Sequence, residues 1–235
     1  IADGDWSSDV CSSDLALASG ESRWITGEPA RRDVHRWRAR SSCVLTGRGT
    51  VAADDPALDV RLDAAELGID RPPRQPGVVI ADAGLRTPPG ARVFSHHERV
   101  VIAAATDQGP AADRLRAAGA EIVALPADEH GIDPGALFRW LAQRAVNEVH
   151  VEAGATLCGR LLATGYIDEL ILYMAPQLLG DTARGLFAFG PLQSMAERVR
   201  LHIRDVRHVG GDLCIRALPI IDREQGDQRQ CRPSS

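Results

Sequence analysis

Residues 152–160 have the types and spacing of a phosphate-binding turn. This segment, Glu-Ala-Gly-Ala-Thr-Leu-Cys-Gly-Arg, places small residues between the end of an expected strand and the start of an expected helix. Backbone N–H groups at such a junction can approach a phosphate closely, and the helix dipole attracts the anion. The segment lacks both the G-x-G-x-x-G of a dinucleotide-binding turn and the Gly-Lys-Ser/Thr of a P-loop. An ordinary tight connection, in which glycine supplies only backbone freedom, explains the same residues equally well.

Glu152 favours the ligand-binding interpretation of this turn. A carboxylate at the carboxyl end of a buried strand faces the crevice in which open α/β sheets bind ligands. A second candidate group lies in the N-terminal third of the chain and comprises Ser22, Trp24, Arg38, Thr50, Asp54 and Arg61. Guanidinium groups hold phosphate oxygens through paired hydrogen bonds, so these residues could orient a phosphorylated sugar. Each of these residues also has a purely structural explanation. The arginines could lie on a solvated surface, Trp24 could pack in the core, and Asp54 could form a turn before Pro56.

The composition narrows the class of protein. The chain has 235 residues, of which 44% are hydrophobic and 25% charged, as in folded, soluble domains. A net charge of -5 argues against nucleic acid and favours small-molecule partners. The five cysteines are an odd number without a Cys-x-x-Cys pair, which predicts free thiols and no metal site. No apolar run reaches the ~20 residues that cross a bilayer and no leader pattern is present, so we expect a cytoplasmic protein without membrane contact.

Both ends of the chain differ from its middle. The stretch 5–15, Asp-Trp-Ser-Ser-Asp-Val-Cys-Ser-Ser-Asp-Leu, has no apolar periodicity and resembles the translation of a sequencing-adapter oligonucleotide. We therefore assign residues 1–15 to a non-native leader without native structure, the alternative being a natural polar tail. Residues 219–235 are mostly polar and aperiodic, which predicts a disordered tail. The functional domain is expected to span residues 16–218.

Hydrophobic periodicity predicts the elements that position these groups. A helix capped by Thr26 should end near Arg40 and turn Val34 and Trp37 inward. A buried strand at 43–45 should lead into a loop at 46–56, and residues 62–76 read as an irregular surface segment. Further strands are expected at 78–80, 100–102, 121–123, 148–151 and 170–173, alternating with helices around 113–118, 137–141 and 157–162. Residues 201–209 and 213–218 suit an antiparallel hairpin. The predicted fold is α/β, with a mixed, mainly parallel sheet flanked by helices and a C-terminal antiparallel hairpin.

Four segments carry a resemblance to a known family. They are Ala-Ser-Gly-Glu-Ser-Arg-Trp-Ile-Thr at 18–26, Ala-Arg-Arg-Asp-Val at 30–34, Thr-Val-Ala-Ala-Asp-Asp-Pro-Ala-Leu at 50–58, and Val-Glu-Ala-Gly at 151–154. In order and spacing they resemble the reductase domain of bifunctional bacterial riboflavin-biosynthesis proteins. The resemblance implies a dihydrofolate-reductase-like fold, a homodimer, and reduction of 5-amino-6-(5-phosphoribosylamino)uracil to its ribitylamino form with NADPH. It also implies a deaminase domain fused upstream in the native gene.

The resemblance assigns roles to particular residues. The residues that it implies for the cofactor are Trp24, Thr50, Asp54, Gly154, Ala155, Thr156, Leu157, Cys158, Gly159 and Arg160. Those that it implies for the phosphorylated pyrimidine substrate are Ser22, Arg38, Leu58, Arg61 and Glu152. Ala83 stands where the family often has a cofactor-contacting serine. Proton delivery is left open between Asp54, Glu152 and water.

Two alternatives to this function remain at this stage. The first is a reductase that acts on the diaminopyrimidinone before deamination. The second is a truncated, non-catalytic fragment that binds NADPH or nothing, because adapter-like residues stand where the family's first core strand should lie. The reductase interpretation requires that Arg38 and Arg61 share a cleft with the turn at Gly154.

Overall fold

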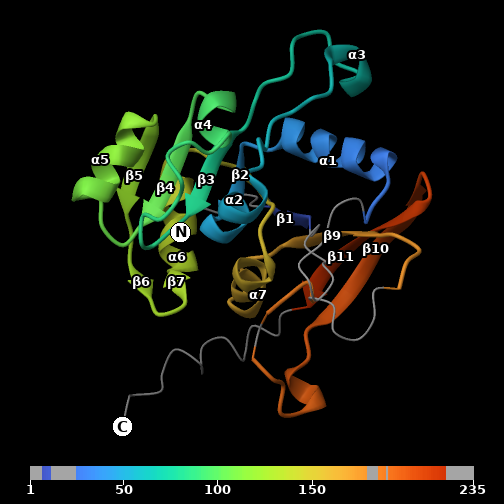
Figure 1. Cartoon of the computed structure of the whole chain (residues 1–235). Coiled ribbons are helices and arrows are strands. Elements are labelled where there is room, and N and C mark those ends of the chain that lie inside the picture. Colours follow the sequence, from blue (N-terminus) through green and yellow to red (C-terminus); the bar gives the residue numbers. More distant parts are fainter. Residues whose placement is uncertain (1–6, 12–24, 179–184, 189, 221–235) are drawn as a thin grey trace.

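A nine-stranded sheet forms the centre of the molecule (Figure 1). The computed structural model describes residues 7–11, 25–178, 185–188 and 190–220. The strands of the sheet, in spatial order, are β10 (Arg200–Val209), β11 (Asp212–Ile220), β9 (Glu169–Met174), β1 (Ser7–Cys11), β8 (Glu148–Val151), β2 (Cys43–Gly47), β3 (Gly77–Ala81), β4 (Val100–Ala104) and β5 (Ala120–Ala124). All pairs from β9 to β5 are parallel, whereas β11 is antiparallel to both β9 and β10. The predicted mixed, mainly parallel sheet with a C-terminal hairpin is confirmed.

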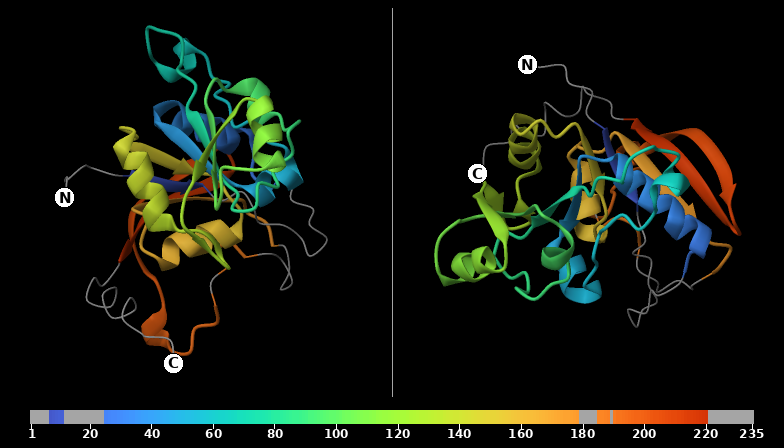
Figure 2. Two further views of the ribbon diagram at one scale, coloured as in Figure 1. Left: turned by 90° about the vertical axis from the view of Figure 1, so that its left-hand side faces the viewer. Right: turned by 90° about the horizontal axis from the view of Figure 1, so that it is seen from above.

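Helices cover both faces of this sheet. They are α1 (Glu28–Arg40), α2 (Arg48–Asp54), α3 (Ala64–Leu67), α4 (Val93–His96), α5 (Pro110–Ala117), α6 (Pro134–Gln143) and α7 (Ala155–Ala163), with a 3₁₀ turn at Met195–Glu197. A small ribbon of β6 (Ala127–Asp128) and β7 (Gly131–Ile132) precedes α6. Figure 2 shows the β10–β11 hairpin and α5 at opposite ends of the molecule. No helix in the described ranges is long and apolar enough to cross a membrane.

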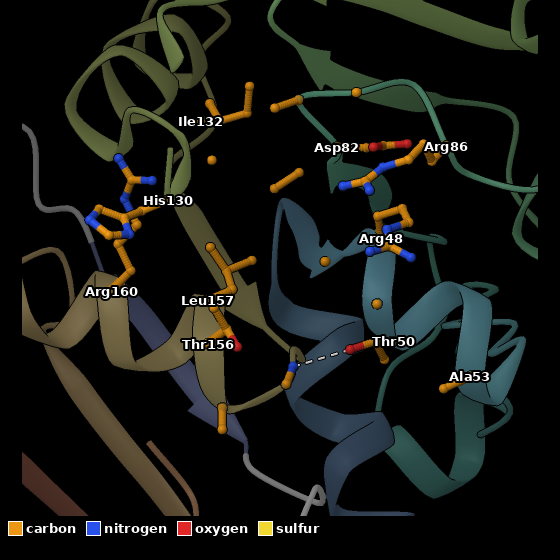
Figure 3. Close-up of a pocket in the computed structure, with 18 of the residues that line it drawn as sticks. Arg48, Thr50, Ala53, Asp82, Arg86, His130, Ile132, Thr156, Leu157 and Arg160 are labelled. Atoms are coloured by element: carbon orange, nitrogen blue, oxygen red, sulfur yellow. Dashed lines mark hydrogen bonds between the residues drawn. The ribbon is translucent and has the colours of Figure 1, made fainter. Parts of the chain in front are cut away.

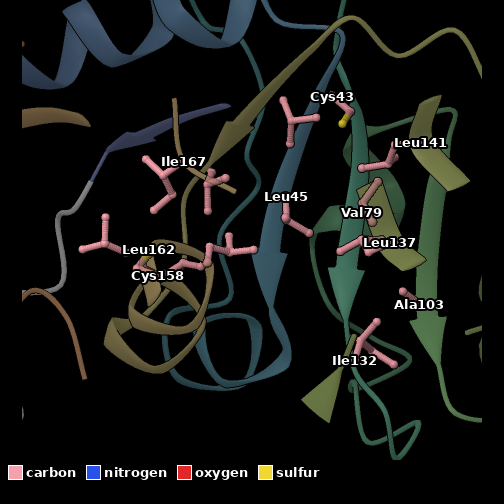
Figure 4. Close-up of a cluster of buried hydrophobic side chains, with 14 of the residues drawn as sticks. Cys43, Leu45, Val79, Ala103, Ile132, Leu137, Leu141, Cys158, Leu162 and Ile167 are labelled. Atoms are coloured by element: carbon pink, nitrogen blue, oxygen red, sulfur yellow. The ribbon is translucent and has the colours of Figure 1, made fainter. Parts of the chain in front are cut away.

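The alternation of side chains along β2 builds two cores, one on each face of the sheet. Leu45 packs with Leu137 of α6 and Leu161 of α7 in one cluster, part of which appears in Figure 4. Its neighbour Val44 belongs to the cluster on the other face, together with Leu115 of α5. Strand β4, Val-Val-Ile-Ala-Ala, is buried along its whole length, as expected for a parallel strand covered on both sides.

Strand β1 overturns one prediction about the N-terminal leader. Ser7–Cys11 forms a strand that pairs in parallel with both β8 and β9, so the expectation of no structure is wrong for these five residues. Without β1, the facing edges of β8 and β9 would leave backbone N–H and C=O groups unpaired inside the sheet. This segment therefore joins the sheet through its backbone hydrogen bonds, although its sequence has no hydrophobic periodicity.

Three boundaries also differ from the sequence prediction. The N-cap of α1 is Gly27, whose N–H donates to the Asp212 carboxylate at 2.7 Å, so Thr26 is not the cap. The expected loop at 46–56 contains α2, a seven-residue helix anchored by the buried Val51. Glycine and threonine in this segment have low helix propensity. The helix therefore depends on tertiary packing, which the sequence pattern does not reveal. Strand β11 runs to Ile220, past the predicted domain end at 218, and residues 221–235 lie outside the described ranges.

Candidate functional site

A cavity of about 880 Å³ opens where β2, β3 and β8 end at their carboxyl edge. Its walls come from the start of α2, the turn after β3, the β6–β7 ribbon and the start of α7 (Figure 3). This volume lies within the range of small-molecule and cofactor sites. The edge is also the one at which open α/β sheets bind ligands.

Thr50 joins the two groups that the sequence analysis singled out. Its hydroxyl accepts a hydrogen bond from the backbone N–H of Gly154 at 3.1 Å, drawn as a dashed line in Figure 3. Gly154 is the N-cap of α7 in an extended conformation, and no side chain caps this helix end. The next N–H groups of the first helical turn have no intrahelical acceptor and lie along the cavity. The contact therefore brings α2 and α7 together around one opening.

Most of the residues implied for the cofactor line this cavity. They are Thr50, Asp54, Gly154, Ala155, Thr156, Leu157 and Arg160. Ala83, where the family often has serine, lines it as well. Ser22 and Trp24 lie outside the described residues.

Cys158 and Gly159 require a correction, because neither lines the cavity. Cys158 is fully buried in the core, and its thiol donates to the carbonyl oxygen of Ala153 at 3.0 Å. A Cβ atom added to Gly159 would collide with the carbonyl oxygen of Ala188, so this glycine permits a close backbone approach. The 3.6-residue period of α7 turns these two positions away from its ligand-facing side.

The outer wall of the cavity is held by an ion pair between Arg160 and Asp128. Two guanidinium nitrogens of Arg160 lie 2.9 and 2.8 Å from the two oxygens of the carboxylate. The backbone N–H of His130 also donates to Asp128, at 2.8 Å. This hydrogen bond, together with the Arg160 guanidinium, lowers the pKa of Asp128. Arg160 thus ties α7 to the β6–β7 ribbon.

A second polar cluster centres on Glu152, at the end of β8. The guanidinium of Arg38 binds its carboxylate through two hydrogen bonds, of 2.5 and 2.7 Å. Arg38 also donates to the carbonyl oxygen of Asp59 at 2.9 Å. The fully buried His150 lies 3.3 Å from the same carboxylate. The side chains of Arg38 and Glu152 are 13% and 12% exposed, so their charges are largely withdrawn from water.

This environment keeps Glu152 ionised. Burial by itself would raise the pKa of Glu152, but the charge and the two hydrogen bonds of Arg38, together with the nearby His150 ring, outweigh it, and the pKa falls well below its usual range. A carboxylate held in this form has no proton to donate at neutral pH. The ion pair with Arg38 makes Glu152 a less suitable proton donor than Asp54, which lines the cavity, or water, and the identity of the donor stays a prediction.

Arg61 and Leu58, which were expected to contact the substrate, lie in other environments. Arg61 is more than half exposed and binds the Asp59 carboxylate at 3.0 Å, so Arg38 and Arg61 meet at Asp59 through its carbonyl and its side chain. Leu58 is 2% exposed and packs in the core, so its side chain is not free to contact a ligand. Neither arginine lines the described cavity, so the predicted cleft shared with the Gly154 turn is not found. Arg38 approaches the turn only through its contact with Glu152, two residues before Gly154.

Arg48, Asp82 and Arg86 are among the residues of the cavity wall that sequence reasoning missed. The signal for Arg48 was its place directly after a strand, but the segment was assigned to a loop. Nothing in the sequence relates it to Arg86, which follows the next strand of the sheet. Within the described ranges no group of three or more His, Cys, Asp and Glu residues is arranged to hold a metal ion.

The fold and the cavity define an α/β protein of the open-sheet class that binds its ligand at the carboxyl ends of parallel strands. The chain belongs to the RibD C-terminal domain family, whose model matches residues 13–215. Its fold is thus the dihydrofolate-reductase-like one that the sequence predicted.

Individual relatives agree with this family. The riboflavin biosynthesis protein RibD of Escherichia coli is 38% identical over 205 residues, which cover 85% of this chain and 55% of that protein. The 5-amino-6-(5-phosphoribosylamino)uracil reductase of Buchnera aphidicola is 30% identical and is covered to 96% of its length. The solved structure of Acinetobacter baumannii RibD, 33% identical, superposes with a TM-score of 0.77 over 92% of this chain and 58% of that one. The chain therefore spans about half the length of the RibD proteins that it matches.

Proposed function

We propose that this domain reduces 5-amino-6-(5-phosphoribosylamino)uracil to 5-amino-6-(5-phosphoribitylamino)uracil with NADPH, in riboflavin biosynthesis. The observation that carries the proposal is the contact between Thr50 and Gly154, which joins two separate ligand-binding segments at one cavity. The name of the Buchnera relative, which this chain covers almost completely, supports the substrate.

The start of α7 fits the pyrophosphate of a dinucleotide. Gly154 exposes a helix end that no side chain caps, and the first-turn N–H groups of Ala155 and Thr156 have no helical acceptor. An anion at this end satisfies these donors and interacts favourably with the helix dipole. When bound, NADPH supplies the hydride. The protein's task is to orient the two ligands and to exclude water from the site.

Besides binding the cofactor, the protein must supply one proton and hold the phosphate of the substrate. The ring oxygen of the ribosylamine takes up a proton and leaves C1 as a hydroxyl group, which gives a protonated imine. C1 of this imine then accepts the hydride, and the nitrogen becomes a neutral secondary amine. We assign the proton that the ring oxygen takes up to Asp54 or to a water molecule, since Glu152 is held as a carboxylate by Arg38. Arg38 and Arg61, which meet at Asp59, are proposed to hold the sugar phosphate.

The test of this proposal is substrate-dependent oxidation of NADPH, followed by absorbance, with wild-type and Arg61→Ala protein. We expect turnover by the wild type and a raised KM for the substrate in the variant. Equal rates in both proteins would overturn the assignment of Arg61, and no oxidation by the wild type would overturn the reductase. Faster turnover of the diaminopyrimidinone would identify the substrate before deamination instead. A rise in Tm with NADPH but no turnover would indicate a non-catalytic binding fragment.

We further propose that the domain forms a homodimer through the exposed face of β10. The bulge between Ile203 and Asp205 keeps Leu201, Ile203 and Val206 on one side of this edge strand, and all three side chains are at least 41% exposed. Apolar residues on an unpaired edge are a liability that a partner strand or sheet would cover. The expected mass in light scattering is twice that of the chain, and Ile203→Lys should give monomers. A monomeric wild type would refute the proposal.

The proposal also concerns the domain that the native gene encodes upstream of this one. We infer that the native gene encodes a deaminase domain upstream of this one, because the chain covers only 55% of the Escherichia coli relative. A biosynthetic enzyme of this kind is proposed to work in the cytoplasm. The upstream genomic sequence tests the first point, and a coding region without a deaminase signature would refute it.

A further inference from the structure

Two arginines face the cavity from one side, although 38 positions separate them in the chain. Arg48 begins α2 directly after β2, and Arg86 follows the turn after β3. Figure 3 shows their side chains near each other on the cavity wall opposite His130 and Arg160. A Cβ atom at Gly84 would lie only 3.2 Å from Nε of Arg86, so glycine leaves room for this side chain.

Two other charged groups on the cavity wall, Arg160 and Asp82, have protein partners. Arg160 is bound by both oxygens of Asp128. Asp82 is 3% exposed, and its Oδ2 accepts from the N–H and the hydroxyl of Thr87 at 2.6 and 2.8 Å. By contrast, within the part of the chain that the structure describes, neither Arg48 nor Arg86 takes part in a hydrogen bond or an ion pair. Two neighbouring guanidinium groups repel each other, and an anion with several oxygens relieves this repulsion.

The position of this pair relative to α7 indicates which anion it would bind. Strands β8, β2 and β3 are consecutive in the sheet, so the turn after β3 lies roughly 10 Å from the start of α7, two strand spacings away. A dinucleotide with its pyrophosphate at α7 would extend its adenosine half across the end of β2 toward this turn. The ribose of that half carries an extra phosphate in NADPH and a free hydroxyl in NADH.

We propose that Arg48 and Arg86 form a clamp for the 2′-phosphate of NADPH and make the domain select NADPH over NADH. The inference rests on the proposed function, because it takes the cofactor site at α7 as given. The orientation of Asp82 also disfavours NADH. A carboxylate after a strand can bind the ribose hydroxyls of NADH, but Asp82 is directed into the Thr87 turn instead.

Steady-state kinetics with both cofactors test this clamp, using Arg48→Ala, Arg86→Ala and the double variant. We expect KM for NADPH to rise about 10- to 100-fold for each arginine removed, and KM for NADH to change much less. Arg114→Ala is the matched control, because it removes one exposed positive charge from α5, outside the cavity. Equal losses with both cofactors, or the same loss in the control, would overturn the clamp.

A competition experiment on the wild type makes the test independent of how the variants fold. Adenosine 2′,5′-bisphosphate should displace NADPH at least about 10-fold better than adenosine 5′-monophosphate, and added salt should reduce that advantage. Equal potency of the two nucleotides would overturn the clamp. Turnover with NADPH and NADH at equal efficiency would overturn the clamp but leave the reductase standing. Failure to bind either cofactor would remove the proposed function itself.

Discussion

Arg38 and Glu152, 114 positions apart in the chain, form a two-point ion pair that fixes the end of β8 to α1. The pair is buried to nearly nine-tenths on both sides, and Asp59 and His150 complete its surroundings. Glu152 lies two residues before Gly154, so this contact sets the direction in which the chain enters the phosphate-binding turn. The ion pair therefore links the proposed substrate arginine to the proposed cofactor site.

Replacing Arg38 by methionine should destabilise the fold strongly. The change leaves the Glu152 carboxylate buried without its counter-charge, which costs about 3–5 kcal/mol of unfolding free energy. Urea unfolding measures this loss. The double variant Arg38→Met, Glu152→Gln should recover much of it, because no buried charge is left unpaired. A single variant as stable as the wild type would contradict the role assigned to the pair.

The Glu152 carboxylate should make stability depend on pH in the acid range. Its pKa is lowered in the folded state from an ordinary 4.5, so the unfolded chain takes up the proton more readily. The stabilisation is complete above pH 4.5 and is lost progressively as the pH falls toward the lowered folded pKa. Urea unfolding of wild-type and Glu152→Gln protein between pH 7 and pH 3 should show a difference that shrinks below about pH 4.5. A difference that does not change with pH would argue against an ionised Glu152.

Thr50→Val should weaken NADPH binding while leaving the fold largely intact. The change removes the acceptor of the Gly154 N–H group and costs about 1–3 kcal/mol if that donor stays unpaired. The turn at α7 would lose its fixed position, and the rise in Tm caused by NADPH should become smaller. Thr50→Ser keeps the hydroxyl and should behave like the wild type. Identical Tm shifts in Thr50→Val and the wild type would show that the contact does not position the turn.

Tyr173→Phe should lower stability without changing turnover. The hydroxyl of Tyr173 donates to Asp33 at 2.6 Å and accepts from the Trp37 indole at 3.0 Å, which fixes α1 on β9. Asp33 also binds Arg207 of β10, so the network spans the hairpin end of the sheet. Loss of the hydroxyl should cost about 1–3 kcal/mol of unfolding free energy, measured in urea. A change in kcat with unchanged stability would show that the network serves catalysis instead.

The thiol of Cys43 should be inert in the folded protein. Burial raises the pKa of Cys43 to about 12, and the side chain is 3% exposed. Alkylation at pH 8 followed by mass spectrometry should leave Cys43 unmodified in the native state and modify it in urea. Rapid labelling of Cys43 in the native protein would show that this strand opens readily.

Local pattern in the sequence determined the regular elements around the site. Short runs of valine and isoleucine marked β3 and β4, because strands covered on both faces must be apolar along their length. The small residues after Glu152 marked the start of α7, and the glycine pair at 210–211 marked the hairpin. These features depend on neighbours in the chain, so a single sequence contains their signal.

Tertiary structure alone decided which side chains meet. Backbone pairing with β8 on one side and β9 on the other placed Ser7–Cys11 in the sheet, and packing turned Cys158 and Leu58 into the core. The ionisation of Glu152 depends on Arg38, and the proposed clamp depends on two strands that bring Arg48 beside Arg86. Hydrophobic periodicity specifies which face of an element is buried, but it carries no information about distant partners. The charges and hydrogen bonds of the site arise from those partners, and therefore only the folded chain fixes them.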